Sequence, residues 1–191
     1  MPSQGDKLNS PQYDYKLLKS VGEDVFISAA VEIRRPHLVS VGRHVAIDTG
    51  FYCTTAMNIG DYIHIAPYIT VIGGPSGLLQ MGHFTTIAAG CRIVCGSDAH
   101  LGEGFVGPTI PERFRDKVTI APVVFADFAS VGTNVVVLPG VTLGEGSVVG
   151  ACSLVTKGTE PWTIYAGTPA KPIKARRKDK MLEMARELGY R

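Results

Sequence analysis

His100 lies near the start of a long polar stretch, residues 97–117, which reads SDAHLGEGFVGPTIPERFRDK. Unperturbed histidine has a pKa of about 6.5, so it accepts a proton near neutral pH without carrying a permanent charge. Such a side chain can act as a general base when a hydroxyl group loses its proton as a new bond forms. His100 is therefore a candidate general base, and either Asp98 or a backbone carbonyl is expected to fix its tautomer.

Basic residues gather at the C-terminal end of the chain. Between Lys171 and Arg191 there are eight Lys or Arg residues against three acids, a charge of +5, whereas the whole chain carries only +2. Such a segment can contact nucleic acid, a membrane surface or bound phosphate, or it can be the solvated face of a helix. Its position after the repeat described below favours a phosphate-bearing cofactor, and no nucleic-acid partner is expected.

The four cysteines are interpreted as small buried thiols in a reducing compartment; they are Cys53, Cys91, Cys95 and Cys152. The Cys91–Cys95 spacing alone does not predict a metal site, because no second cysteine pair or nearby histidine pair completes it. No run of about 18 apolar residues predicts a transmembrane helix. The polar start of the chain lacks the apolar core of a secretory signal, so a cytoplasmic protein is expected.

A six-residue repeat fills the stretch from Phe125 to Thr156. An apolar residue opens each block, and a small residue follows it in four of the six blocks; the apolar positions are Phe125, Val131, Val137, Leu143, Val149 and Val155. This period matches neither a helix nor a single strand, and it indicates a short unit that stacks on copies of itself. Three short strands per turn would form a triangular prism filled with aliphatic side chains. The sequence therefore predicts an all-β solenoid.

The same ladder organises most of the chain as a single domain. It starts at Val21, shifts by two residues near residue 35, runs on to Val71, and is broken again at residues 73–77 and 97–117. We expect residues 1–20 to form an N-terminal cap and residues 21–157 to form the solenoid, which carries the loop 97–117. Residues 158–191 are a C-terminal extension. It ends in an amphipathic helix whose apolar stripe is core or subunit contact; the stripe comprises Met181, Met184, Ala185 and Leu188.

The ladder resembles that of the hexapeptide-repeat acyltransferases. Two segments carry the resemblance, PVVFADFASVGTNVVVLPGVTLGEGSVVGACSLVTK and WTIYAGTPAKPIK, and it can be followed from Val21 to Arg177. The resemblance implies a left-handed parallel β-helix. The handedness comes from the resemblance alone, because parallel crossovers are usually right-handed. It also implies a homotrimer, since the family places coenzyme A between neighbouring prisms.

The resemblance assigns roles to particular residues. His100 takes the place of the family's catalytic histidine, and acetyl-CoA is the implied acyl donor. The backbone amides of Thr133 and Ala151 would contact the pantetheine arm, and Thr156 and Lys157 would lie near the adenosine end. Lys171 and Lys174 would bind the phosphates of coenzyme A as point charges, with Arg176 and Arg177 as possible substitutes.

The acceptor is expected to contact the loop 97–117. Asp98, Glu112 and Arg115 are the candidate substrate-binding residues, and the run from Pro108 to Glu112 resembles an element of the sugar O-acetyltransferase branch, the galactoside, maltose and lipopolysaccharide O-acetyltransferases. The main expectation is an acetyl-CoA-dependent O-acetyltransferase for a saccharide hydroxyl in bacterial surface-polysaccharide biosynthesis. The alternative is an N-acetyltransferase for a nucleotide-linked amino sugar, so the acceptor partner is a small sugar or nucleotide sugar.

A zinc enzyme is the competing class, because some left-handed β-helix proteins are carbonic anhydrases with three histidine ligands. His64, His83 and His100 are spaced at about one coil, but the paired His-x4-His spacing of those enzymes is missing. We therefore expect no metal. The remaining histidines are interpreted as polar residues on outer faces or at a subunit groove.

Overall fold

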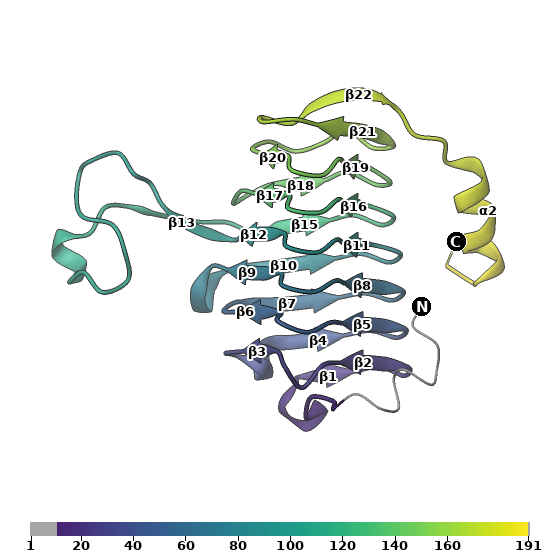
Figure 1. The fold of residues 1–191 in the computed structure, drawn as a ribbon, viewed down its shortest axis with the longest axis horizontal. Coiled ribbons are helices and arrows are strands. Elements are labelled where there is room, and N and C mark those ends of the chain that lie inside the picture. The colour runs from purple at the N-terminus through teal and green to yellow at the C-terminus, as the bar shows by residue number, and fades with distance from the viewer. Residues whose placement is uncertain (1–10, 191) are drawn as a thin grey trace.

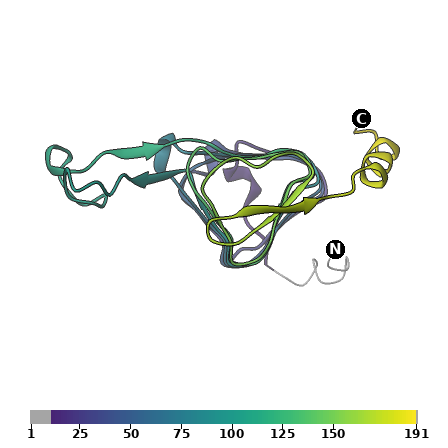
Figure 2. The same cartoon turned by 90° about the horizontal axis from the view of Figure 1, so that it is seen from above.

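The chain winds into a triangular solenoid of parallel strands, shown from the side in Figure 1 and from above in Figure 2. The computed structural model describes residues 11–190. Each coil contributes one short strand to each of three flat sheets, and neighbouring strands of a sheet come from successive coils. The six-residue period explains this arrangement, because three blocks complete a coil and place Val149 directly beside Val131. The predicted all-β solenoid is confirmed.

The strands of the three faces follow one another in coil order. The first sheet contains β1 (Ser20–Val21), β4 (Val39–Val41), β7 (Ala56–Ile59), β10 (Leu78–Met81), β15 (Val123–Phe125) and β18 (Thr142–Leu143). The second contains β2 (Val25–Ile27), β5 (Val45–Ile47), β8 (Ile63–Ile65), β11 (Thr86–Ile87), β16 (Ser130–Val131), β19 (Val148–Val149), β21 (Thr163–Ala166) and β22 (Lys171–Ala175). The third contains β3 (Glu32–Ile33), β6 (Tyr52–Cys53), β9 (Thr70–Ile72), β12 (Arg92–Val94), β17 (Val136–Val137) and β20 (Leu154–Val155).

Apolar side chains fill the inside of the prism from end to end. All six residues that open the blocks from Phe125 to Val155 are buried. Val21 departs from the ladder, because it lies in the first coil and 36% of it is exposed. A strand in a terminal coil has a neighbouring coil on one side only, so its side chain keeps contact with solvent.

The three edges of the prism differ in character. The aromatic corner joins the first sheet to the second and carries a column of rings; its members are His44, Tyr62, Phe84, Phe128 and Trp162. Each of them has a positive φ, as the sharp turn at each coil requires. The amide corner joins the second sheet to the third and carries Ala89, Thr133 and Ala151. The arm corner joins the third sheet to the first.

The stretch predicted as an irregular loop is a structured arm. Its two ends pair as an antiparallel ribbon, β13 (Gly96–Asp98) with β14 (Val118–Ile120), and the ribbon projects away from the arm corner. The short 3₁₀ helix η4 (Glu112–Phe114) lies further out along the arm. An excursion this far from the prism has no solenoid strand to pair with, so its backbone groups satisfy one another.

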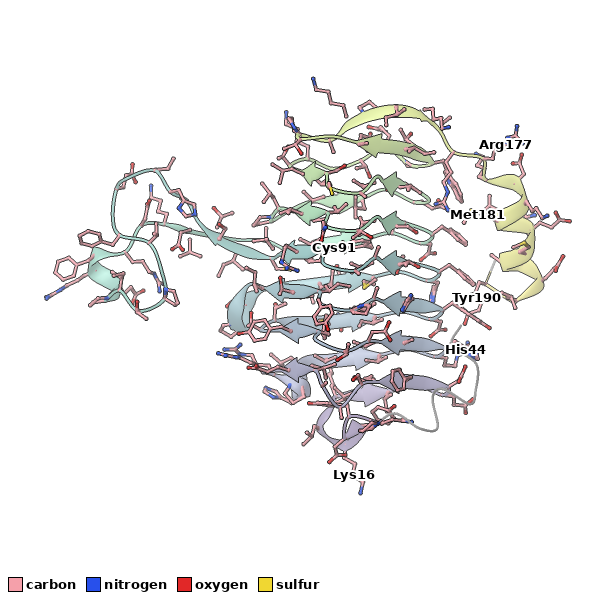
Figure 3. All side chains as sticks on the ribbon, viewed as in Figure 1. Lys16, His44, Cys91, Arg177, Met181 and Tyr190 are labelled. Atoms are coloured by element: carbon pink, nitrogen blue, oxygen red, sulfur yellow. The ribbon has the colours of Figure 1, made fainter. Side chains whose placement is uncertain are left out.

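The C-terminal extension returns along the outside of the prism. Strand β22 pairs antiparallel with β21 at the end of the second sheet, and the helix α2 (Asp179–Glu187) then runs back beside the prism. Tyr190 points at the aromatic corner (Figure 3), where its hydroxyl donates a hydrogen bond of 2.6 Å to Asp61 and its ring packs edge-on against Tyr62 and Phe84. The predicted C-terminal helix is therefore confirmed.

The apolar stripe of α2 is only partly covered by this chain. Ala185 is buried, whereas Met184 and Leu188 are 48% and 51% exposed. The stripe is therefore not a core element of the single chain. No helix within residues 11–190 is long and apolar enough to cross a membrane.

At the opposite end, three short 3₁₀ helices accompany the first coils: η1 (Tyr15–Leu17), η2 (Pro36–Leu38) and η3 (Gly74–Ser76). The backbone of Tyr13 donates a hydrogen bond of 2.9 Å to Ile27, and Leu18 is buried. Residues 11–20 therefore lie against the first coil, and residues 1–10 of the predicted cap lie outside the described part of the chain.

Adjacent residues on β10 test the importance of the filled prism. Leu79 is fully buried, and its neighbour Gln80 is exposed. Leu79→Ala should lower the free energy of unfolding by about 2–5 kcal/mol because it leaves a cavity between coils. Gln80→Ala should change it by no more than about 0.5 kcal/mol. Denaturant unfolding of the two variants makes the comparison, and equal losses would contradict a core formed by inward residues alone.

Candidate active site

A cavity of about 570 Å³ lies at the arm corner, where the arm leaves the prism. Its walls come from the ends of third-sheet strands in three coils and from the base of the arm. Arg34, Arg35, Tyr52 and Thr54 line one side of it. The opposite side is lined by residues of the turn after β9 and of the arm: Ile72, Gly73, Gly74, Pro75, Gly96, Ser97, Asp98, Gly107, Pro108, Arg115 and Val118.

Two glycines allow the arm to leave the prism at this point. A Cβ on Gly96 would lie 3.0 Å from the Cα of Gly73, and a Cβ on Gly73 would lie 2.8 Å from the Cβ of Cys95. Distances this short leave no room for a side chain between the arm and the turn after β9. The close approach of the two backbones therefore shapes one wall of the cavity.

The cavity wall carries a net positive charge. Three arginines line it, against the single carboxylate of Asp98. The guanidinium of Arg35 donates a hydrogen bond of 2.6 Å to the carbonyl of Thr54. The guanidinium of Arg34 lies 5.3 Å from the centre of the Tyr52 ring and also bonds to Glu32 at 2.9 Å. The remaining positive charge and the guanidinium donors suit an anion.

The predicted acceptor residues divide between this cavity and the outer arm. Asp98 and Arg115 both line the cavity, whereas Glu112 lies in η4 and is exposed. Pro108 brings the start of the predicted Pro108–Glu112 element to the cavity wall. Arg34, Arg35 and Tyr52 were missed from the sequence, because the bend near residue 35 shows only as a phase shift in the ladder.

His100 lies on the arm just beyond β13. Its side chain is exposed and is not part of the cavity wall, although Asp98 two residues earlier is. Its backbone has a positive φ of 56°, which is uncommon for a residue with a Cβ. His100 is therefore accessible to solvent on the arm, outside the cavity.

Thr133 and Ala151 stack on successive coils at the amide corner. The carbonyl of Thr133 accepts a hydrogen bond of 2.8 Å from the backbone of Cys152. Within residues 11–190, neither the Thr133 nor the Ala151 backbone N–H donates to a protein acceptor. The corner therefore presents a column of exposed amide donors, which suits a ligand that carries carbonyl groups.

The four remaining predicted cofactor residues lie near the top of the prism. Lys171 and Lys174 lie on the exposed strand β22, whereas Thr156 and Lys157 follow β20 and lie at the arm corner. Lys171 is the first residue of β22 and pairs with Ala166. Ala166 lies next to Gly150, which belongs to the amide corner. The candidates thus lie on the second sheet and at the arm corner, and do not form one cluster.

Three of the four thiols are buried in the prism, as expected. They are Cys53, Cys91 and Cys95, and Cys91 is marked in Figure 3. Burial raises the pKa of Cys53 to about 12 and that of Cys95 to about 11. Cys152 departs from the prediction, because it follows Ala151 at the amide corner and is exposed.

The histidines do not form a ligand cluster. His64 lies next to Thr86 in the second sheet and bonds to Asp48 at 2.8 Å, whereas His83 lies at the aromatic corner beside Tyr190. Across the part of the chain that the structure describes, no three His, Cys, Asp or Glu side chains are grouped to hold a metal ion.

Known proteins of similar sequence and structure share this architecture. No protein-family model matches the chain. The dTDP-4-amino-4,6-dideoxy-D-glucose acyltransferase of Escherichia coli is 33% identical over 171 residues, which cover 87% of this chain and 86% of the relative.

Two crystal structures of variants of AntD, an N-acyltransferase from Bacillus cereus, align with a TM-score of 0.88. The first, in complex with dTDP and coenzyme A, is 32% identical, and the match covers 94% of this chain and 98% of that one. The second, in complex with dTDP-4-amino-4,6-dideoxyglucose and coenzyme A, is 31% identical, with 94% and 97% covered. A hexapeptide-repeat acetyltransferase of Vibrio cholerae, at 22% identity and a TM-score of 0.55, shares the fold.

The solenoid with its arm and the similarity over nearly the whole length define an enzyme of the acyltransferase class. Within that class, this chain belongs to the hexapeptide-repeat acyltransferases. The predicted family is therefore confirmed. The sugar O-acetyltransferase branch is not, because the relatives that match nearly the full length are an N-acyltransferase and an amino-sugar acyltransferase.

Thiol labelling tests the exposure of the amide corner. Near neutral pH, iodoacetamide should modify Cys152 in the folded protein and leave the three buried cysteines unmodified, because a buried thiol is inaccessible and resists ionisation. Mass spectrometry of the labelled peptides identifies the site. A Cys152→Ser variant should take up no label until it is unfolded. Rapid labelling of Cys53 in the folded protein would contradict the closed prism.

Proposed function

We propose that this enzyme transfers the acyl group of an acyl-CoA, with acetyl-CoA as the expected donor, to the amine of a nucleotide-linked amino sugar. The observation that carries the proposal is the near full-length similarity to an amino-sugar acyltransferase and to AntD with dTDP-4-amino-4,6-dideoxyglucose and coenzyme A bound. The comparisons favour this acceptor, the sequence-based alternative, over a saccharide hydroxyl.

The cavity at the arm corner is the proposed acceptor site. A nucleotide sugar carries a diphosphate with about two negative charges, and guanidinium groups bind phosphate oxygens through paired hydrogen bonds. Three arginines line the cavity with Asp98, and Glu32 pairs with Arg34, so the site keeps a net positive charge that favours a phosphate-bearing ligand. The volume of about 570 Å³ lies in the range of sites for small ligands.

The amide corner is the proposed donor site. Pantetheine is a mostly neutral arm that carries amide groups, so the exposed N–H groups of Thr133 and Ala151 suit its carbonyls. Lys171 and Lys174 lie near the top of the prism, where they can meet the phosphates of coenzyme A. Thr156 and Lys157 lie at the arm corner. They would therefore contact a coenzyme A molecule that is bound at the amide corner of a neighbouring chain.

The two proposed sites require more than one chain. The whole third sheet separates the amide corner from the arm corner within one prism. A homotrimer would place the arm corner of one chain next to the amide corner of another, so donor and acceptor would meet between chains. His100, which is exposed on the arm, would then act at that junction. We propose that the reaction takes place in the cytoplasm, as the sequence analysis expects.

The chemistry needs one proton acceptor. The lone pair of the sugar amine attacks the thioester carbonyl, a C–N bond forms, the C–S bond breaks, and the coenzyme A thiolate leaves. His100 takes the proton that the amine loses and returns it to the thiolate. A neutral amine is a good nucleophile by itself, so it depends on the base less than a hydroxyl does.

A matched pair of acceptors tests the function. With acetyl-CoA, dTDP-4-amino-4,6-dideoxyglucose should release free coenzyme A thiol, and the analogue with a hydroxyl in place of the amine should not. His100→Asn should lower kcat toward the lower end of the roughly 10²–10⁴-fold range for a lost general base, with coenzyme A binding retained. Equal thiol release with the hydroxyl analogue would contradict the amine acceptor and favour an O-acetyltransferase.

A second test addresses the arginines of the cavity. Arg35→Gln should raise the KM for the nucleotide sugar about 10- to 100-fold, because a hydrogen bond to a charged group contributes about 1.5–3 kcal/mol. The KM for acetyl-CoA should not change. Arg43→Gln is the matched control, since Arg43 contacts Asp61 and Tyr190 at the aromatic corner. If both variants bind the nucleotide sugar like wild type, the cavity is not the acceptor site.

A further inference from the structure

Asp116 is a buried acid on an arm that projects into solvent. Among residues 11–190 it is the one buried residue with a charged side chain, and only 4% of it is exposed. Burying a carboxylate is unfavourable unless hydrogen bonds replace its lost water. The contacts of Asp116 must therefore compensate for the cost of its burial.

Both oxygens of Asp116 accept backbone hydrogen bonds. One accepts from the N–H of Leu101 at 2.9 Å, and the other accepts from the N–H of Lys117 at 2.7 Å. The first bond joins the two strands of the arm across a separation of fifteen residues. The carboxylate thus acts as a bridge between the outgoing and the returning halves of the arm.

The outgoing half held by this bridge contains His100. On one side of His100, the backbone N–H of Ala99 donates to the carbonyl of Lys117 at 2.7 Å. On the other side, the N–H of Leu101 donates to Asp116. Between these two fixed points His100 has the left-handed φ of 56°, which is disfavoured for a residue with a Cβ and persists only where the surroundings hold it.

The neighbouring backbone packs tightly around the same bridge. Gly104 lies so close to the returning strand that a Cβ on it would be 2.6 Å from the backbone nitrogen of Asp116. The N–H of Asp116 in turn donates to the carbonyl of Phe105 at 2.9 Å. These contacts restrict the backbone of the turn, and with it the direction of the Cα–Cβ bond of His100.

We propose that Asp116 is the positioning residue for His100: its carboxylate holds the left-handed turn that directs the imidazole outward to the substrate. The proposal rests on the proposed function, in which His100 is the base. Asp116 touches neither substrate in this scheme and acts only through the turn. A held turn sets the direction in which the Cα–Cβ bond of His100 leaves the backbone, and the exposed imidazole then needs to adjust only its own side-chain torsions for proton transfer.

Asp116→Asn tests the proposal, because an amide side chain has one acceptor oxygen where the turn requires two. We expect kcat to fall about tenfold with the KM for acetyl-CoA unchanged, and the Leu101 or Lys117 amide to exchange about tenfold faster with solvent deuterium. In a His100→Asn background the same substitution should lower kcat less than about twofold, because its effect passes through His100. Glu103→Gln is the matched control, since it breaks only the exposed ion pair of 3.4 Å with Lys117 on the same arm.

Two results would overturn the proposal. An equal fall in kcat with and without His100 would show that Asp116 supports the arm in general, and unchanged exchange at both amides would show that it does not hold the turn. If the wild-type enzyme acylates neither the amine nor the hydroxyl acceptor, the proposed function fails. The exchange rates then still decide whether Asp116 holds the turn around His100.

Discussion

The contact between one coil and the next is the interaction on which the structure depends. Inward side chains pack against their counterparts one coil away, and the strands of neighbouring coils pair in parallel, as Val131 does with Val149 and, across the arm, Ile87 does with Val131. The hydrophobic effect and the hydrogen-bond ladder therefore act along the same axis. The cavity and the arm lie on the outside of that stack, at one of its edges.

The repeat explains why so much of the fold was predictable. A period of six identifies inward residues without any tertiary information, and positions such as Ile47, Ile87 and Val137 are fully buried. The same regularity made residues 97–117 visible as a departure. The repeat did not predict the structure within residues 97–117, because the ribbon β13–β14 and the burial of Asp116 depend on pairing between residues that are distant in sequence.

The site was predicted less completely, for a related reason. Asp98 and Arg115 were expected from their place in the arm, and both line the cavity. Arg34 and Arg35 lie far earlier in the sequence and reach the cavity only because successive coils stack their third-sheet ends above one another. A one-dimensional pattern shows which residues point outward, but it does not show which outward residues share an edge with the arm.

Tyr190 gives the stack a property that a simple solenoid lacks. Contacts between neighbouring coils are local in sequence, so a prism of this kind can grow from any coil and fray from either end. The hydrogen bond from Tyr190 to Asp61 spans 129 residues and ties the end of the chain to the early coils. Tyr190 follows α2, so this contact joins the end of the chain to a coil in the first half of the prism, and it should make the unfolding of the two halves more cooperative.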